Sequence, residues 1–317
     1  MNALDDTAYD MVVHSRDDTT EGVAVLELVP ATDRPLPRWQ PGAHIDVLLP
    51  DGDARQYSLC GDPGAQAYRI AVLREPEGRG GSMWIHDTLR PGVTARVAGP
   101  RNHFEFVPER GTRYRFLAGG IGITPIVAML RSAAEAGVDY ALEYAGRSRS
   151  SMALLGELQE LHGSRVAVHA ADEGARLDIP ALFADLPPFT TTYCCGPARF
   201  IEAVEEAARG RQLKVERFEA KELGEPLLTV PFEVELVFSG ETITVPPEKT
   251  VLQAIEDAGV LVLSSCKVGT CGTCETRVLA GEVDHRDSIL TADEQAANDV
   301  MYVCVSRSAG PSLTLEL

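Results

Sequence analysis

The sequence predicts a multidomain chain, in which an antiparallel β-barrel is followed by an α/β domain with a parallel sheet and then by a small α+β domain. Three observations support this order. Short β-rich runs separated by turns fill the first third of the chain, strands and helices alternate in the middle, and a tight group of cysteines lies near the end. A chain of 317 residues is long enough for two or three such domains.

The composition is that of an ordinary globular protein, with 44% hydrophobic and 24% charged residues. The formal net charge of −18 makes nucleic acid and anionic membrane surfaces poor partners. Residues 226–317 carry 14 Asp and Glu against 5 Lys and Arg, which fits either a solvated acidic face or a docking face for a basic partner. The chain has seven cysteines, and we see neither a leader-like segment nor an apolar run of membrane-spanning length. We therefore expect a cytoplasmic protein with reduced cysteines.

Residues 1–108 are expected to form the antiparallel barrel, or a sandwich of the same strands. Turn signals such as Pro-Gly and Asp-Gly separate five apolar or alternating runs, at Gly22–Val29, His44–Leu49, Arg55–Cys60, Tyr68–Leu73 and Thr94–Ala98.

Two motifs in this part predict an anion site. Arg55–Ser58 ends a strand, and Gly78–Ser82 opens a helix expected at Met83–Leu89. The N–H groups at a Gly-Gly-Ser helix start favour a phosphate, and the guanidinium of Arg55 can pair with the same group. Tyr57 offers a flat face and the Ser58 hydroxyl a donor, so a flavin phosphate is the natural anion once redox chemistry is indicated elsewhere in the chain.

Residues 109–222 are expected to form the parallel α/β domain, because strands alternate with helices. The expected elements are strands at Tyr114–Ala118, Tyr140–Ala145, Arg165–Ala170 and Thr191–Cys195, and helices at Ile126–Ala136, Met152–His162, Ile179–Leu186 and Ala198–Gly210.

Ligands of open α/β sheets bind at the carboxyl edge of the strands, and two motifs fall there. Gly119–Pro125 joins a strand to a helix, with glycines that let a pyrophosphate approach the backbone. Cys195–Pro197 ends the last strand, where Cys195 could touch a nicotinamide ring while Cys194 alternates into the core. Arg147 and Arg149 follow another strand and could face an adenosine ribose or solvent.

After a linker at 223–231, residues 232–317 hold a C-x4-C-x2-C motif completed by a distant cysteine. This is the spacing of a plant-type 2Fe–2S site, and the expected ligands are Cys266, Cys271, Cys274 and Cys304. Structural zinc is the alternative, although zinc sites usually come as two short-spaced pairs. A hairpin, Glu233–Phe238 with Thr242–Val245, and a helix at Val251–Ala258 should precede the motif.

Taken in order, these motifs resemble the phthalate dioxygenase reductase family, in which an FMN-binding barrel and an NAD domain precede a plant-type ferredoxin of the β-grasp fold. The resemblance implies that Phe218 covers the flavin ring, and that Ser58, Cys195 and Phe218 are the catalytic residues. The cofactor-binding residues expected from the motifs and the resemblance together are Arg55, Gln56, Tyr57, Ser58, Gly80, Gly81, Ser82, Gly119, Gly120, Gly122, Thr124, Pro125, Cys195, Gly196, Pro197 and Phe218.

The expected function is electron transfer from NADH through FMN and a 2Fe–2S cluster to a terminal oxygenase of Rieske type, which hydroxylates or O-demethylates an aromatic or similar small molecule. A flavin is needed because NADH gives up two electrons as hydride and the cluster takes one. Two alternatives remain, an FAD-dependent reductase serving a cytochrome P450 or diiron hydroxylase, and an iron–sulfur redox sensor. NADPH in place of NADH stays open, and we expect a monomer.

Overall fold

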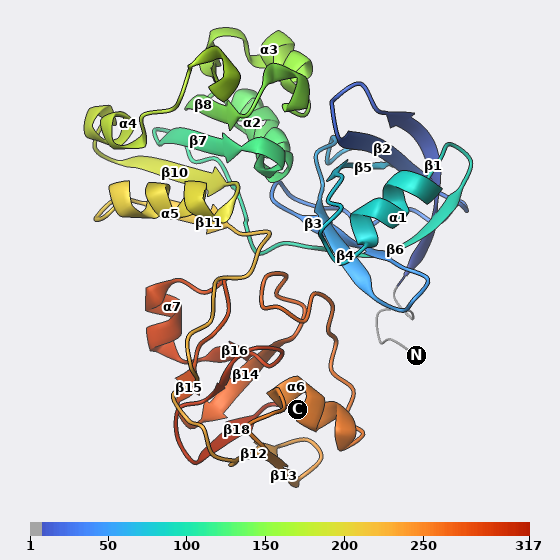
Figure 1. Cartoon of the computed structure of the whole chain (residues 1–317), viewed down its shortest axis with the longest axis vertical. Coiled ribbons are helices and arrows are strands. Elements are labelled where there is room, and N and C mark those ends of the chain that lie inside the picture. Colours follow the sequence, from blue (N-terminus) through green and yellow to red (C-terminus); the bar gives the residue numbers. More distant parts are fainter. Residues whose placement is uncertain (1–7) are drawn as a thin grey trace. The chain divides into compact units, whose positions relative to one another are not determined.

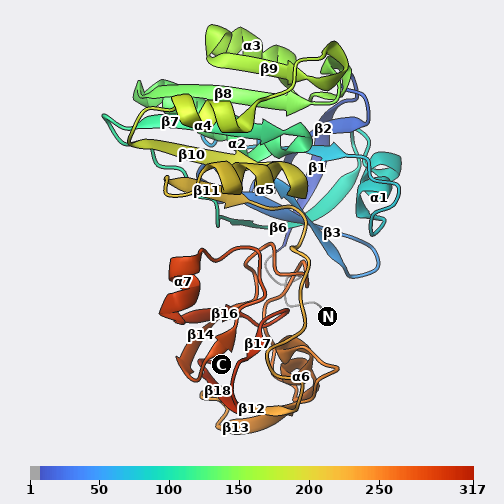
Figure 2. The same cartoon turned by 60° about the vertical axis from the view of Figure 1, so that its left-hand side comes forward.

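The computed structural model describes residues 8–317, which form two compact units, Ala8–Phe218 and Glu219–Leu317 (Figures 1 and 2). The first unit contains two of the three expected folds and the second unit contains the third. No helix in the described part of the chain is both long and apolar enough to cross a membrane.

The first part of unit Ala8–Phe218 is a six-stranded antiparallel sheet with the order β4-β3-β6-β1-β2-β5. Strand β1 was not predicted as a separate run, yet its backbone pairs with both β2 and β6. The core contains the side chains of Met11, Leu26, Ile45 and Ile70. The elements are β1 (Tyr9–Asp17), β2 (Val23–Pro30), β3 (His44–Leu48), β4 (Ala54–Ser58), β5 (Tyr68–Leu73), α1 (Gly81–Thr88) and β6 (Thr94–Arg101).

The second part of this unit is a five-stranded parallel sheet with the order β11-β10-β7-β8-β9. Helices α2 and α3 share one hydrophobic core with the sheet, and α4 and α5 share another, so both faces are covered (Figure 1). The elements are β7 (Arg113–Gly119), α2 (Ile123–Ala136), β8 (Asp139–Gly146), α3 (Leu155–His162), β9 (Val166–Ala170), α4 (Ile179–Asp185), β10 (Thr190–Cys195), α5 (Ala198–Ala207) and β11 (Leu213–Glu216). The alternation of strands and helices was predicted correctly, but β11 was not expected.

Unit Glu219–Leu317 contains a mixed five-stranded sheet with the order β13-β12-β18-β14-β16, in which β12 and β18 are parallel. Helix α6 begins at a capping box between Thr250 and Gln253 and packs into the core of this sheet. The elements are β12 (Phe232–Leu236), β13 (Glu241–Val245), α6 (Val251–Asp257), β14 (Glu275–Ala280), β15 (Val283–Asp284), α7 (Ala292–Ala297), β16 (Val300–Tyr302), β17 (Arg307–Ser308) and β18 (Ser312–Leu315). The predicted hairpin and first helix are present.

Candidate redox sites

The two barrel motifs lie against each other. A Cβ atom added to Gly81 would come within 2.4 Å of Cγ of Arg55, so the arginine side chain crosses the start of α1. Its Nη2 donates to the carbonyl oxygen of Arg79 at 2.9 Å, and its Nη1 donates to that of Ala54 at 2.9 Å. The guanidinium is thus held at the N-terminus of α1, where the helix dipole also favours an anion. A flavin phosphate fits this arrangement.

Two other predicted residues of these motifs already have partners. The side-chain amide of Gln56 donates to Asp46 Oδ1 at 2.5 Å. The Ser82 hydroxyl accepts a hydrogen bond from the N–H of Glu75 at 3.1 Å. Helix α1 is capped by Gly80, with φ of 81°, so Ser82 is not the capping residue. A left-handed glycine turn starts the helix in place of a side-chain cap.

The two nucleotide motifs interlock at the carboxyl edge of the parallel sheet. A Cβ atom on Gly122 would lie 2.4 Å from the carbonyl oxygen of Cys195, and one on Gly119 would lie 2.9 Å from Cδ of Pro197. The two loops therefore touch through their backbones, as the edge position of both motifs predicted. Thr124 is buried, and its hydroxyl donates to the carbonyl oxygen of Ile121 at 3.0 Å.

Cys194 and Cys195 point into different cores. Cys194 packs with α4 and α5, as expected for a core residue, and Cys195 packs with the residues around α2. Both side chains are fully buried, and burial raises the pKa of each thiol. The Cys195 thiol therefore stays protonated at neutral pH and is not a reactive thiolate.

One residue of the site was missed by sequence reasoning. Glu216, the last residue of β11, accepts a hydrogen bond from the Ser58 hydroxyl at 3.5 Å and so joins the barrel motif to the nucleotide domain. Burial raises the pKa of Glu216 to about 8, and the hydrogen bond from Ser58 offsets only part of this rise. Phe218 follows two residues later with 42% of its surface exposed. The missed signal was the apolar–charged alternation of Leu213–Glu216, which marks a short strand.

The four predicted cluster cysteines are brought together in unit Glu219–Leu317, and all four are buried. The N–H groups of Val268 and Thr270 each donate to Cys266 Sγ at 3.4 Å, and the N–H of Cys266 donates to Cys271 Sγ at 3.5 Å. Gly269 and Gly272 both have positive φ, at 71° and 74°, and so allow the loop to curl around the sulfur atoms.

The thiols of this loop interact with one another. Hydrogen bonds from the thiols of Cys271 and Cys304, followed by those from the backbone, lower the pKa of Cys266. The same contact with Cys266 raises the pKa of Cys271 and of Cys304. We favour a two-iron core over zinc here, because the C-x4-C-x2-C motif with one distant cysteine has the spacing of a plant-type 2Fe–2S site, whereas structural zinc sites usually come as two short-spaced pairs.

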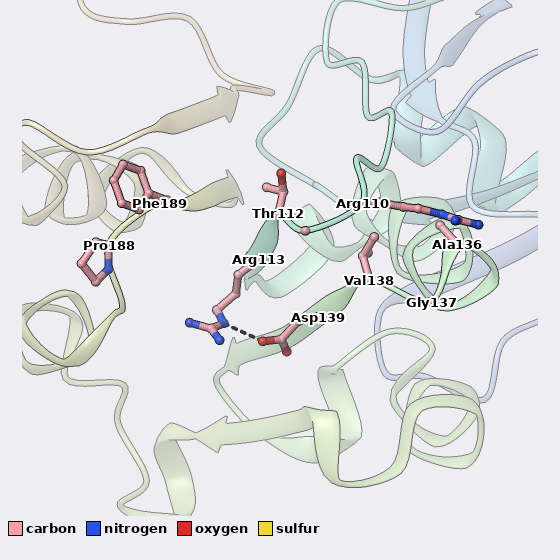
Figure 3. A pocket seen from close by; sticks show the side chains of 10 residues that line it. Arg110, Thr112, Arg113, Ala136, Gly137, Val138, Asp139, Pro188 and Phe189 are labelled. Carbon is pink, nitrogen blue, oxygen red and sulfur yellow. Dashed lines mark hydrogen bonds and ion pairs between the residues drawn. The ribbon is translucent and has the colours of Figure 1, made fainter.

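A surface cavity of about 610 Å³ lies at the opposite edge of the parallel sheet, where β7 and β8 begin. Figure 3 shows Arg113 and Asp139 joined by an ion pair between the side chains that line it, with Nε to Oδ2 at 2.5 Å. Because nucleotide motifs occupy the carboxyl edge, this cavity is separate from the redox site.

Comparison with known proteins agrees with this geometry. Residues 236–309 match the family described as the 2Fe-2S iron-sulfur cluster binding domain, and residues 116–206 match the oxidoreductase NAD-binding domain. The chain is 45% identical to phenoxybenzoate dioxygenase subunit beta of Ectopseudomonas oleovorans, over 91% of this chain and 90% of that protein.

Two solved structures are similar over nearly the whole chain. One is an intact type IV self-sufficient cytochrome P450 monooxygenase, with 46% identity and a TM-score of 0.91 over 98% of this chain; the chain spans only 41% of that protein. The other is phthalate dioxygenase reductase, with 33% identity and a TM-score of 0.71, and here both chains are covered in full. With its fold, its motif order and its full-length relatives in agreement, the chain belongs to the phthalate dioxygenase reductase family of oxidoreductases.

Proposed function

We propose that this protein is the reductase component of an oxygenase system, and that it passes electrons from NADH through FMN and a 2Fe–2S cluster to a terminal oxygenase. The observation that carries the proposal is that the Ser58–Glu216 hydrogen bond joins the flavin motif to the nucleotide domain within one compact unit. The second unit supplies four converging thiols that fit a one-electron carrier.

The barrel would hold FMN by its phosphate. Arg55 pairs with the phosphate while the N–H groups at Gly80 and Gly81 donate to it, and Tyr57 and Ser58 face the ring. Gln56 and Ser82 would contribute backbone groups, because their side chains have other partners. When bound, the flavin accepts a hydride and releases single electrons, which neither NADH nor the cluster can do alone.

The nucleotide motifs would position NADH with its nicotinamide near the flavin. The loops around Gly119, Gly122 and Cys195 pack closely against each other, and the backbone at Gly120, where an added Cβ atom would meet nothing within 4 Å, would be open to a pyrophosphate. Gly120, Thr124, Pro125, Gly196 and Pro197 complete the loops. Cys195 would border the nicotinamide through its backbone, because its side chain is buried in the core, and Phe218 would cover the ring until nicotinamide enters.

Ser58 and Glu216 would hold a proton at the flavin. Oxidation of NADH by one-electron acceptors releases a proton for each pair of electrons, so the site needs a group that exchanges it. The carboxyl of Glu216 is neutral below about pH 8 and lies within hydrogen-bond reach of the Ser58 hydroxyl. The pair therefore keeps a proton at the carboxyl instead of placing a fixed negative charge beside the ring.

The terminal acceptor is proposed to be a Rieske-type oxygenase acting on an aromatic or similar small molecule. Phenoxybenzoate dioxygenase subunit beta and phthalate dioxygenase reductase, both similar to this chain over most of their length, support this choice. A haem acceptor is the second candidate, because the self-sufficient cytochrome P450 contains a region 46% identical to this chain. FMN is favoured over FAD because the Gly-Arg-Gly-Gly-Ser arrangement resembles that of the FMN-binding reductases, and a cytoplasmic monomer remains our expectation.

Anaerobic titration of the purified protein with NADH tests the proposal. We expect the flavin absorption to bleach together with the broader iron–sulfur absorption, and heat-released flavin to have the mass of FMN. The reduced protein is then mixed with the oxygenase component of phenoxybenzoate dioxygenase or with an isolated P450 haem domain. Faster reduction of the haem would favour the second candidate, and failure of NADH to reduce the flavin would reject both.

A further inference from the structure

The ends of β8 and β9 lie where the adenosine half of the dinucleotide must go. In the strand order β11-β10-β7-β8-β9, the nicotinamide motifs lie on β7 and β10, and the flavin motif meets the end of β11 through Glu216. The rest of the dinucleotide therefore extends toward β8 and β9. The distance across the sheet from β10 to β9 is three strand spacings, or about 14 Å. Two riboses and a pyrophosphate can span this distance.

This end of the edge carries two arginines and two carboxylates from adjacent loops. Arg147 and Arg149 follow β8, and Asp172 and Glu173 follow β9. The N–H of Asp172 donates to the carbonyl oxygen of Arg147 at 3.0 Å, which ties the two loops together. All four residues are exposed, so their charged groups are accessible to a ligand at this edge.

Arg149 is already engaged with one of these carboxylates. Its Nε donates to Oε1 of Glu173 at 2.8 Å, and each side chain keeps 46% of its surface exposed. A 2′-phosphate would have to compete with Glu173 for this guanidinium and would also meet the charge of Asp172. A ribose 2′-hydroxyl carries no charge and can donate a hydrogen bond to a carboxylate.

We propose that Asp172 and Glu173 make this protein selective for NADH, by neutralising Arg149 and by repelling the 2′-phosphate of NADPH. This inference depends on the proposed function only for the position at which the nucleotide binds. The preference for NADH or NADPH was left open by Arg147 and Arg149 in the sequence.

The test compares Glu173→Gln with the wild-type protein and with Glu160→Gln, which removes an exposed carboxylate from α3 at a distance from the edge. Binding of ADP and of 2′,5′-ADP is measured by calorimetry, and kcat/KM is measured with NADH and NADPH using ferricyanide as the acceptor. We expect Glu173→Gln to raise kcat/KM for NADPH and affinity for 2′,5′-ADP roughly threefold to fivefold, with changes below about twofold for NADH and ADP.

A second variant shows that the gain depends on Arg149. Adding Arg149→Gln to Glu173→Gln should abolish the gain in 2′,5′-ADP affinity, since no freed guanidinium remains. Equal discrimination in wild type and Glu173→Gln, or a wild-type preference for 2′,5′-ADP, would overturn the inference. The calorimetry needs no electron transfer, so a protein that binds these nucleotides selectively but is not reduced by NADH would reject the proposed function and leave the inference standing.

Discussion

Replacing Glu216 by glutamine should remove a pH-dependent loss of stability from unit Ala8–Phe218. The pKa of Glu216 is raised by burial to about 8, from 4.5 for the free carboxyl. Below pH 4.5 the folded and unfolded chains both hold the proton. Between pH 4.5 and 8 the folded chain keeps a proton that the unfolded chain has lost, so stability falls as the pH rises through this window. Glutamine does not titrate, and the fall should disappear.

The size of the effect follows from the width of the window. A gap of about 3.5 pH units at about 1.36 kcal/mol each gives a ceiling of about 5 kcal/mol. Glu216 is only half-buried by its accessible surface, and water reduces the penalty for its charge. We therefore expect wild type to lose about 2–3 kcal/mol more than Glu216→Gln between pH 5 and pH 8.

Urea unfolding followed by tryptophan fluorescence is a suitable assay, because Trp39 and Trp84, the two tryptophans of the chain, both lie in the barrel. The full chain is unfolded with saturating FMN at several pH values, and Glu202→Gln, an exposed carboxylate on α5, serves as the control. The control should keep the wild-type slope. Parallel curves for wild type and Glu216→Gln would mean that Glu216 is ionised throughout, which would refute the reasoning.

Three further changes test other parts of the site. Cys304→Ser should abolish the iron–sulfur absorption and the EPR signal of the reduced protein but leave flavin reduction by NADH within about twofold. Cys60→Ala, at a buried cysteine of unit Ala8–Phe218, should keep the cluster. Gly81→Ala places a Cβ 2.4 Å from Arg55 and should weaken FMN binding, measured by fluorescence quenching, at least about tenfold. Gly80→Ala meets open space at φ of 81° and should cost only about 1 kcal/mol of stability, so an equal loss of FMN affinity would contradict the packing argument. Gly122→Ala should lower the free energy of unfolding by about 1–3 kcal/mol, and unchanged stability would show that the loop can shift.

The main architecture could be predicted because each part has a distinct pattern. Alternation of strands and helices set the parallel sheet, and the edge position of its loops implied that Gly122 and Cys195 would meet. Cysteine spacing alone predicted that Cys266 and Cys304 come together across a long gap. These features depend on local sequence or on a fixed rule of topology.

What the sequence could not predict depends on contacts between distant segments. Glu216 belongs to the site because it contacts Ser58, which is 158 residues away in the sequence. No residue near Glu216 in the sequence indicates that partner. The short strands β15 and β17 have two residues each and form only by pairing with each other. Ser82 belongs to a motif that predicts a phosphate site, but its hydroxyl is bound to the backbone at Glu75, seven residues earlier.

The backbone contact between Gly122 and Cys195 restricts how this protein can diverge. Because the two nucleotide loops leave no room for a side chain between them, a change in one loop requires a matching change in the other before the fold is regained. Selection for a different nucleotide can act more easily on the exposed ends of β8 and β9, where single substitutions do not disturb the packing. Variants that change coenzyme preference should therefore accumulate at that end of the sheet, while the loops at the nicotinamide end stay fixed.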